Sequence, residues 1–314
     1  MNMKNLIYLT LVGMATGCAF AQTESVEHQW TVTFNVVDDT SQPVAGAKTW
    51  VSYHVPPPPD MRIAYEKIEG ITDTNGVFVA SHRSRTGALG FHVEKTGYYT
   101  LRIPHDLPDQ YDSTRWNVTT NLLLKRMVQP IPMYAKRIDK GPPVLDKPIG
   151  YDMMAGDWVA PDGKGANADI IFTKTYNMKS NSDYESKLTV SFPNPGDGIQ
   201  AFDAPSRIDE GSALRSPYEA PGNGYQPTLT RLNSSHPGQP LIFEYDANRN
   251  YFVRVRTVLD EKGNVKSALY GKIYGDFMHI CYYLNPTPNS RNVEFDPKQN
   301  LLKDLNSLEQ VMNP

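Results

Sequence analysis

Cysteine is almost absent from this sequence, because Cys18 and Cys281 are the only two in 314 residues. If an N-terminal signal is removed, one thiol remains, and a single thiol cannot form an internal disulfide. Cys281 lies in the apolar run 277–284, which is typical of a buried strand. We therefore interpret Cys281 as a small core residue without a catalytic role.

Sequence patterns of known catalytic and metal sites are also missing. The seven histidines show neither the His-x-His nor the His-Glu-x-x-His spacing of metal ligands, and no serine stands in a Gly-x-Ser-x-Gly or Ser-x-x-Lys frame. Gly-Lys-Gly at residues 163–165 lacks the spacing and the following Ser or Thr of a phosphate-binding loop. The sequence therefore predicts no catalytic residue, no metal site and no cofactor.

Charge of one sign does not dominate either. The 31 basic and 34 acidic residues are mixed along the chain and give a net charge of −3. No basic stripe is present that could neutralise a phosphate backbone, so nucleic acid is not an expected partner. Apolar runs are short, and none approaches the ~20 residues of a membrane-spanning helix.

The N-terminal segment, residues 1–21, has the pattern of a secretory signal peptide. Lys4 supplies the positive charge, an apolar stretch follows, and residues 19–21 (Ala-Phe-Ala) fit a small-x-small cleavage site. We expect cleavage before Gln22 and a periplasmic or extracellular protein. Ala-Thr-Gly-Cys ending at Cys18 partly matches a lipobox, so a lipoprotein anchored through Cys18 is the alternative.

Proline, glycine and tyrosine are plentiful, with 25, 22 and 18 residues. Such a composition favours many short strands joined by turns. Residues 30–37 alternate apolar and polar side chains at the period of a half-buried strand. Residues 73–76 (Asp-Thr-Asn-Gly) have the chemistry of a turn. We predict an all-β protein in which residues 22–128 form an antiparallel β-sandwich.

The order of these elements resembles the carboxypeptidase regulatory-like family. The matching elements are Asp39-x-x-x-Pro43-Val44-x-Gly46-Ala47, Thr72-Asp73-x-Asn75-Gly76-x-Phe78 and Lys95-x-Gly97-Tyr98-Tyr99. The resemblance covers about the first third of the chain, and it departs from the family at Ser41-Gln42, where glycine is usual, and at the proline run 56–59. It implies a transthyretin-like (prealbumin-like) sandwich that serves exported and surface proteins as an accessory module without catalytic residues.

A second, loop-rich β domain is expected over residues 151–314, after a proline-rich linker at residues 129–150. The turn at residues 260–264 between two strand-like runs is the strongest hairpin signal in the chain. Leucine and methionine at spacings of three and four over residues 301–312 predict a C-terminal amphipathic helix.

This second part is similar to uncharacterised exported bacterial proteins, and that similarity implies no activity. The residues that carry it are 282–289 (Tyr-Tyr-Leu-Asn-Pro-Thr-Pro-Asn) and 294–297 (Glu-Phe-Asp-Pro).

The stretch 193–239, rich in proline and glycine, is the candidate ligand-binding region, because long loops in compact domains often carry function. Two tyrosines there offer flat faces for sugar stacking, and three charged residues accompany them. The candidate site residues are Tyr218, Tyr225, Asp197, Asp203 and Arg215.

These observations predict a non-catalytic exported envelope protein whose second domain binds glycan, peptide or another envelope protein. The alternative is a carbohydrate-active or other hydrolase with carboxylates in the 193–239 loops. A glycosidase needs only two opposed carboxylates, and their separation is a matter of geometry that the sequence leaves open.

Overall fold

The computed structural model describes residues 28–55, 64–84, 88–106, 117–138, 141–204, 211–275, 277 and 280–314. The predicted signal peptide at 1–21, the cleavage site before Gln22 and the alternative lipid anchor at Cys18 lie outside these residues. The described part contains twenty strands and no helix, which confirms the all-β prediction. In that part, no helix has the length and apolar character needed to span a membrane.

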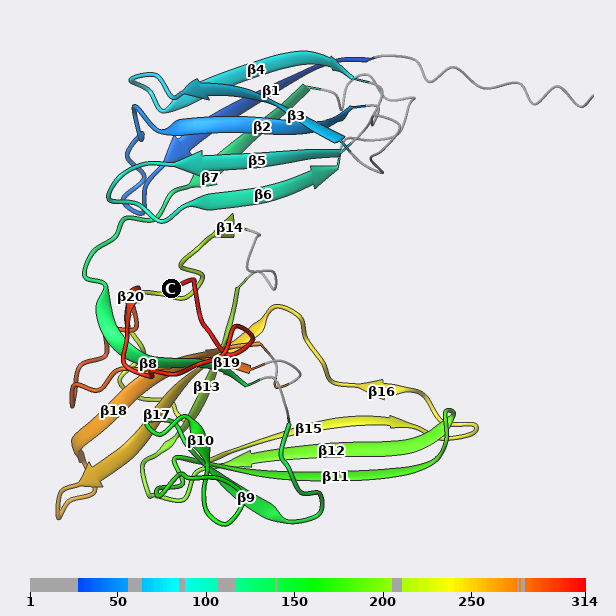
Figure 1. Cartoon of the computed structure of the whole chain (residues 1–314), viewed down its shortest axis with the longest axis vertical. Coiled ribbons are helices and arrows are strands. Elements are labelled where there is room, and N and C mark those ends of the chain that lie inside the picture. The colour runs from blue at the N-terminus through cyan, green and yellow to red at the C-terminus, as the bar shows by residue number, and fades with distance from the viewer. Residues whose placement is uncertain are drawn as a thin grey trace, which may run out of the picture.

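The first unit, residues 28–128, consists of two sheets that enclose one core (Figure 1, top). The smaller sheet has the order β4 (Val77–Ser84), β1 (His28–Val37), β7 (Asn117–Leu123). The larger has the order β14 (Gly211–Ser212), β6 (Leu101–Asp106), β5 (Ala88–Glu94), β2 (Lys48–Val55), β3 (Ala64–Ile71).

One pairing in the first unit differs from the predicted antiparallel sandwich, because β1 pairs with β7 in parallel. The preceding strand β6 belongs to the other sheet, so the chain crosses between sheets before β7 instead of turning back in a hairpin. The edge strand β14 also comes from a distant part of the sequence and pairs with β6.

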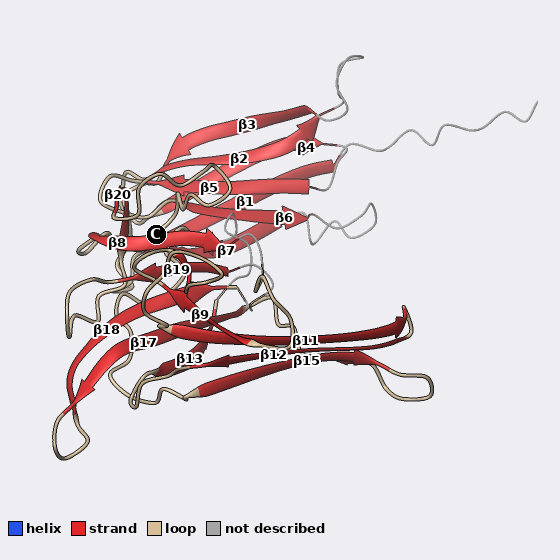
Figure 2. Ribbon diagram, turned by 60° about the horizontal axis from the view of Figure 1, so that its bottom comes forward, coloured by secondary structure: helices blue, strands red, loops and turns tan. Residues whose placement is uncertain are grey.

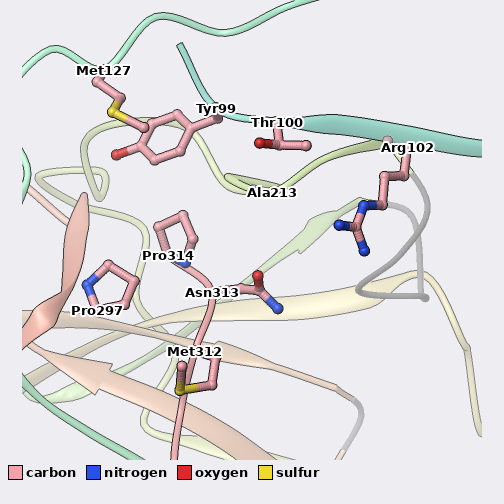
Figure 3. A pocket seen from close by; sticks show the side chains of 10 residues that line it. Tyr99, Thr100, Arg102, Met127, Ala213, Pro297, Met312, Asn313 and Pro314 are labelled. Atoms are coloured by element: carbon pink, nitrogen blue, oxygen red, sulfur yellow. The ribbon is translucent and has the colours of Figure 1, made fainter. Parts of the chain in front are cut away.

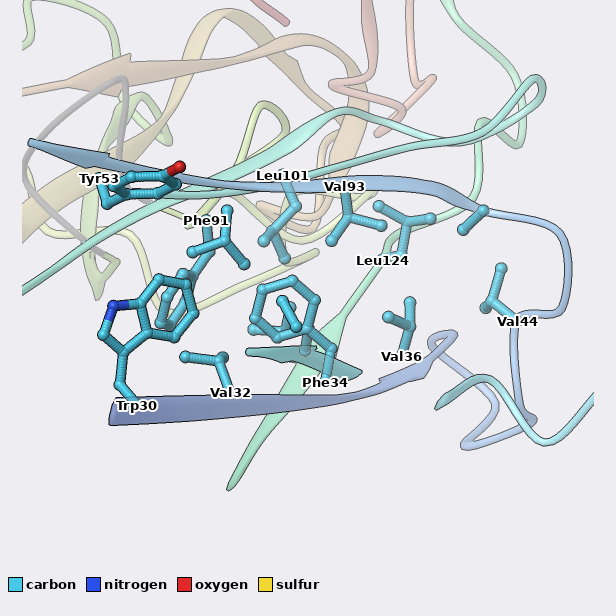
Figure 4. Packing of buried hydrophobic residues seen from close by; sticks show 14 residues of the cluster. Trp30, Val32, Phe34, Val36, Val44, Tyr53, Phe91, Val93, Leu101 and Leu124 are labelled. Atoms are coloured by element: carbon cyan, nitrogen blue, oxygen red, sulfur yellow. The ribbon is translucent and has the colours of Figure 1, made fainter. Parts of the chain in front are cut away.

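The core of the first unit follows from the alternation along β1. Every second side chain from Trp30 to Val36 is buried, whereas the residues between are not. These side chains meet the opposite sheet, where the Phe34 and Phe91 ring centroids lie 5.0 Å apart (Figure 4). Burying one such apolar side chain stabilises the fold by about 1.5–3 kcal/mol.

The second unit, residues 129–314, contains two six-stranded sheets (Figures 1 and 2). One has the order β10 (Asp157–Trp158), β9 (Pro148–Asp152), β11 (Ile170–Ser180), β12 (Asp183–Ser191), β15 (Thr228–Ser235), β16 (Ile242–Phe243). The other has the order β13 (Gly198–Asp203), β17 (Arg249–Leu259), β18 (Val265–Tyr274), β19 (Ile280–Leu284), β8 (Ile131–Ile138), β20 (Phe295–Asn300). The largest core of this unit contains side chains of both sheets.

Two predictions about this unit are wrong in part. The supposed linker 129–150 contains β8, which pairs with β19 on one side and with β20 on the other. The stretch 193–239 is not one long loop, because it includes β13, β14 and β15. Proline-rich composition misled the prediction in both places, since prolines lie within β8 and next to β15.

The predicted C-terminal helix over residues 301–312 is absent, and the segment is a series of turns. The Asn306 side chain accepts hydrogen bonds from the backbone of Leu308 and Glu309, which competes with helical hydrogen bonding. Asp304 has a φ of +59°, a left-handed conformation that a right-handed helix does not contain.

Candidate functional site

The two predicted tyrosines contact other parts of the chain. Tyr218 Oη donates a hydrogen bond to the carbonyl of Arg126 at 2.8 Å and lies 3.0 Å from an Asp39 carboxylate oxygen, so it bridges the two units. Burial, together with this carboxylate, raises the pKa of Tyr218. Tyr225 Oη donates to the carbonyl of Pro221, and the Arg254 guanidinium lies 4.8 Å from the Tyr225 ring centroid.

The three predicted charged residues lie in separate environments. Asp197 is buried and accepts hydrogen bonds from the backbone of Arg256 and Thr257. Asp203 is exposed and forms an ion pair with Arg249. The guanidinium of Arg215 lies 4.0 Å from the ring centroid of Tyr274.

The structure therefore does not bring the five predicted residues into one site. None of them lines either of the two cavities described below. Their selection rested on residue type within one stretch of sequence, whereas their contacts are with side chains and backbone elsewhere in the fold.

The junction between the two units is held by a buried carboxylate. Glu294 is 1% exposed and accepts hydrogen bonds from Tyr99 Oη at 2.7 Å and from the backbone N–H groups of Val128 and Gln129. Burial and the Glu294 carboxylate raise the pKa of Tyr99. Lys125 Nζ also donates to the carbonyl of Ser216 at 3.0 Å. These contacts fix the chain where it passes from one unit to the other.

A cavity of about 310 Å³ lies beside this junction and is the candidate functional site (Figure 3). Segments from four distant parts of the sequence line it, which explains why the sequence alone did not reveal it. Its lining residues are Tyr99, Thr100, Arg102, Met127, Gly211, Ala213, Pro297, Met312, Asn313 and Pro314.

Arg102 is the only charged side chain among these lining residues. Figure 3 shows its guanidinium and the Asn313 side chain facing the same space. Thr100 adds a hydroxyl, and Met127 and Met312 add apolar surface. The described lining therefore combines one cationic side chain, two polar side chains and apolar surface, beside the last residue of the chain, Pro314.

The Arg102 guanidinium is oriented by a histidine on the neighbouring strand. Arg102 Nε donates to His92 Nδ1 at 3.3 Å, and His92 Nε2 lies 3.4 Å from a Glu94 carboxylate oxygen. The His92 ring stacks on Trp50 with 3.4 Å between ring centroids. Burial lowers the pKa of His92, against the opposing effect of Glu94, so the ring is neutral at pH 7. Nδ1 then accepts from Arg102 while Nε2–H donates to Glu94.

A second cavity of about 310 Å³ lies within the second unit. Its charged lining includes Lys136, Arg137, Asp157 and Glu309, so charges of both signs are present. Lys136 and Glu309 form an ion pair of 2.8 Å. This balance gives the second cavity no marked preference for an anion or a cation.

Two buried carboxylates of the second unit, Asp152 and Asp169, share one guanidinium. Arg256 contacts Asp152 at 2.9 Å and Asp169 at 2.7 Å. Burial raises the pKa of Asp169, whereas backbone hydrogen bonds and Arg256 outweigh burial and lower the pKa of Asp152. Backbone N–H groups occupy both oxygens of Asp152. The arrangement resembles a structural ion cluster more than an open pair of catalytic acids.

Metal binding has no evident place in the described part of the chain, where no three His, Cys, Asp or Glu side chains gather. Cys281 is partly buried, and this burial raises the pKa of its thiol. An unreactive core thiol is the expected consequence.

A projecting arm of the second unit carries several exposed apolar side chains. We define the arm as residues 174–188 and 230–245, which comprise the outer parts of β11, β12 and β15 together with β16. Figures 1 and 2 both show these strands extending away from the rest of the molecule. Its exposed apolar side chains are Tyr176, Met178, Leu241, Ile242, Phe243 and Tyr245.

Comparison with known proteins identifies no family: no family model and no curated protein matches the chain. A catechol 1,2-dioxygenase from an Acinetobacter species matches 34% of this chain and 55% of its own, at 13% identity and a TM-score of 0.26. A shaft pilin from Lactobacillus rhamnosus GG matches 55% of this chain and 90% of its own, at 14% identity and a TM-score of 0.24. A putative membrane-associated protein of unknown function from Bacteroides fragilis matches 84% of this chain and 99% of its own, at 12% identity and a TM-score of 0.22. Scores this low establish neither a shared fold nor a shared function.

Proposed function

We propose that the protein is an exported, non-catalytic envelope protein that binds another protein through the apolar face of its arm. In this proposal the first unit is an accessory module of the carboxypeptidase regulatory-like kind. The observation that carries the proposal is the apolar face itself.

The face spans four strands and carries its exposed apolar side chains on the two outer ones, with the polar Ser186 and Asn233 between them. Tyr176 pairs with Ser186, Ser186 with Asn233, and Asn233 with Phe243, so the first and last of these side chains lie on the same face of the sheet. Met178 shares that face, because side chains two residues apart in a strand point the same way. Nearer the body of the molecule, Lys174 follows on the same face, and beyond it Phe172 lies in the core.

The exposure of apolar side chains on this face supports binding of a partner protein there. Tyr176, Met178 and Phe243 are 44%, 50% and 57% exposed, although they continue a core-facing surface. Contiguous apolar patches on soluble proteins commonly mark protein-binding sites, and aromatic and methionine side chains are enriched in such interfaces. The opposite face of β11 carries threonine, asparagine and lysine instead.

The hydrolase alternative has weaker support. Its carboxylates were expected in the 193–239 stretch, where Asp197 accepts backbone hydrogen bonds and Asp203 pairs with Arg249. Both are engaged within the protein, at positions that line neither cavity described above.

Site-specific photocrosslinking in the producing cells tests the proposal. A photoreactive residue at position 178 should yield a discrete protein adduct, whereas one at position 177, on the opposite face, should not. Phe243→Ser should abolish the adduct, and Ile242→Ser should preserve it because Ile242 lies on the other face. Light scattering of the purified protein then tells whether the partner is a second copy. Equal adducts from both positions, or none from either, would contradict the proposal.

A further inference from the structure

We infer that the protein partner of the arm presents a carboxylate beside its apolar anchors, and that Lys174 and Arg231 at the base of the arm receive this carboxylate. The inference rests on the proposed function, and it names the chemistry of the partner that the arm binds.

The face of the arm that carries Tyr176 has cationic side chains and no acidic ones. Lys174 pairs with Leu188, and Leu188 pairs with Arg231, so these three side chains form one row across the face. Two more rows follow toward the tip of the arm, Tyr176-Ser186-Asn233-Phe243 and Met178-Tyr184-Ser235. None of the residues in these three rows is Asp or Glu. The face is therefore cationic at its base and carries its exposed apolar side chains farther out.

The acidic residues of the arm's strands and hairpin lie outside these rows. Glu185 pairs with Asn177, whose side chain points to the opposite face from its neighbours in β11. Asp183 forms an ion pair with His236. The Glu244 carboxylate accepts a hydrogen bond from a backbone N–H of β15. Each of these carboxylates is thus placed or engaged away from the base of the face.

Lys174 makes the carboxylate a requirement of binding. Among the described residues it takes part in no ion pair, and it is already half-buried between Tyr176 along the strand and Leu188 across it. Side chains two residues apart in a strand are separated by about 7 Å. A partner that covers Tyr176 therefore also covers Lys174, and burying an unpaired ammonium group is costly. A carboxylate on the partner removes that cost.

Arg231 adds a second positive charge that the fold holds in place. Its guanidinium donates to Tyr251 Oη and lies 5.8 Å from the Tyr251 ring centroid, and Tyr251 is buried. Lys174 and Arg231 lie two strand spacings apart, which is about 10 Å. Two cations at this separation attract an acidic segment and set the direction in which it lies on the sheet.

The apolar part of the face favours a protein over an acidic polysaccharide. Methionine offers no flat surface for a sugar ring, whereas it is enriched in protein interfaces, and Met178 is 50% exposed. Met178 lies four residues from Lys174, or about 13 Å along the strand. An extended peptide covers that distance with four residues, so its carboxylate and its apolar anchor should be close in sequence.

The adduct formed by a photoreactive residue at position 178 tests the inference. We expect the attached peptide of the partner to contain Asp or Glu within about four residues of the attachment site. Lys174→Glu in the same chain should lower the adduct yield at least tenfold, because like charges then meet at the contact, and Lys174→Met should lower it less. Replacing the partner's carboxylate by lysine should restore the adduct with Lys174→Glu. Lys187→Glu is the matched control and should keep the yield, since Lys187 pairs with Thr175 on the opposite face.

The outcomes separate this inference from the proposed function. No adduct at position 178 without a charge change, or attachment to a polysaccharide, would overturn both. A full yield in Lys174→Glu, equal losses in Lys174→Glu and Lys187→Glu, or an attached peptide without a carboxylate in reach would overturn the acidic partner and leave the apolar docking site standing. The attached peptide is identified with Lys174 in place, so it decides the question even if Lys174→Glu fails to fold.

Discussion

The hydroxyl of Tyr99 donates a 2.7 Å hydrogen bond to the carboxylate of Glu294 across 195 positions of sequence. The same carboxylate caps the backbone N–H groups of residues 128 and 129, where the chain leaves the first unit. One buried side chain thus fixes the angle between two β units.

Glu294→Ala should strongly destabilise the protein, because three donors, among them the buried Tyr99 hydroxyl, lose their acceptor. We expect the free energy of unfolding to fall by about 3 kcal/mol or more. Glu219→Ala, which removes an exposed ion pair with Arg291, should change it by less than about 1 kcal/mol. Urea denaturation of the two variants and the unaltered protein measures both effects. Similar losses in the two variants would contradict the role assigned to Glu294.

Asp38 should contribute stability that disappears in acid. Burial alone would raise the pKa of Asp38, but hydrogen bonds from Thr40 and Gln42 and the Arg126 guanidinium lower it to about 2. Because the folded pKa is below the unfolded value, the contribution is fully present above about pH 4 and is lost as the pH falls through 2. The stability difference between the unaltered protein and Asp38→Asn should therefore shrink between pH 4 and pH 2. A difference independent of pH would show that the carboxylate charge is not involved.

Gly76 should tolerate no side chain. Its φ is +73°, and a Cβ atom there would lie 2.4 Å from the Val36 carbonyl oxygen. Gly46 has a similar φ of +70°, but a Cβ atom there would meet nothing within 4 Å, so it is the matched control. Gly46→Ala should cost about 1 kcal/mol for the left-handed backbone alone, and Gly76→Ala clearly more than about 2 kcal/mol. Equal thermal shifts in the two variants would refute the steric argument.

Lys272 should be replaceable by methionine at neutral pH without loss of stability. Its ammonium group is fully buried and donates to Ser216 Oγ at 3.1 Å, and none of the ion pairs among the described residues includes it. Burial lowers the pKa of Lys272, so the unfolded state binds more protons and the unaltered protein gains stability as the pH rises toward 10.5. Lys272→Met should lack this gain, since it has no proton to lose. Denaturation curves from pH 7 to pH 10 measure the difference, and parallel curves would contradict it.

Local structure could be predicted from the sequence where the residues of a single strand or a single turn form a recognisable pattern. The alternation over residues 30–37 and the turn at 260–264 correspond to β1 and to the β17–β18 hairpin. In both places neighbouring residues specify the structure, through the two-residue period or through turn chemistry.

Long-range structure could not be predicted, because the decisive partners are remote. Strand β8 has two prolines near its start, so its sequence is typical of a linker. Only its pairing with β19 and β20 identifies it as a strand. The inter-unit cavity combines residues near positions 100, 127, 212 and 313, which share no local pattern. The tyrosines and acids of the 193–239 stretch were predicted as site residues from their residue types alone. Their actual partners, such as Arg126 and Arg249, lie outside this stretch and are known only from the fold.

Strand β14 means that the two units are not independent building blocks. Two residues from the middle of the second unit complete the edge of the larger sheet of the first, beside β6. A fragment that ends at residue 128 would leave that edge unpaired and open to association with other chains. To transfer the first unit into another protein with this edge intact, β14 would have to be carried along or replaced.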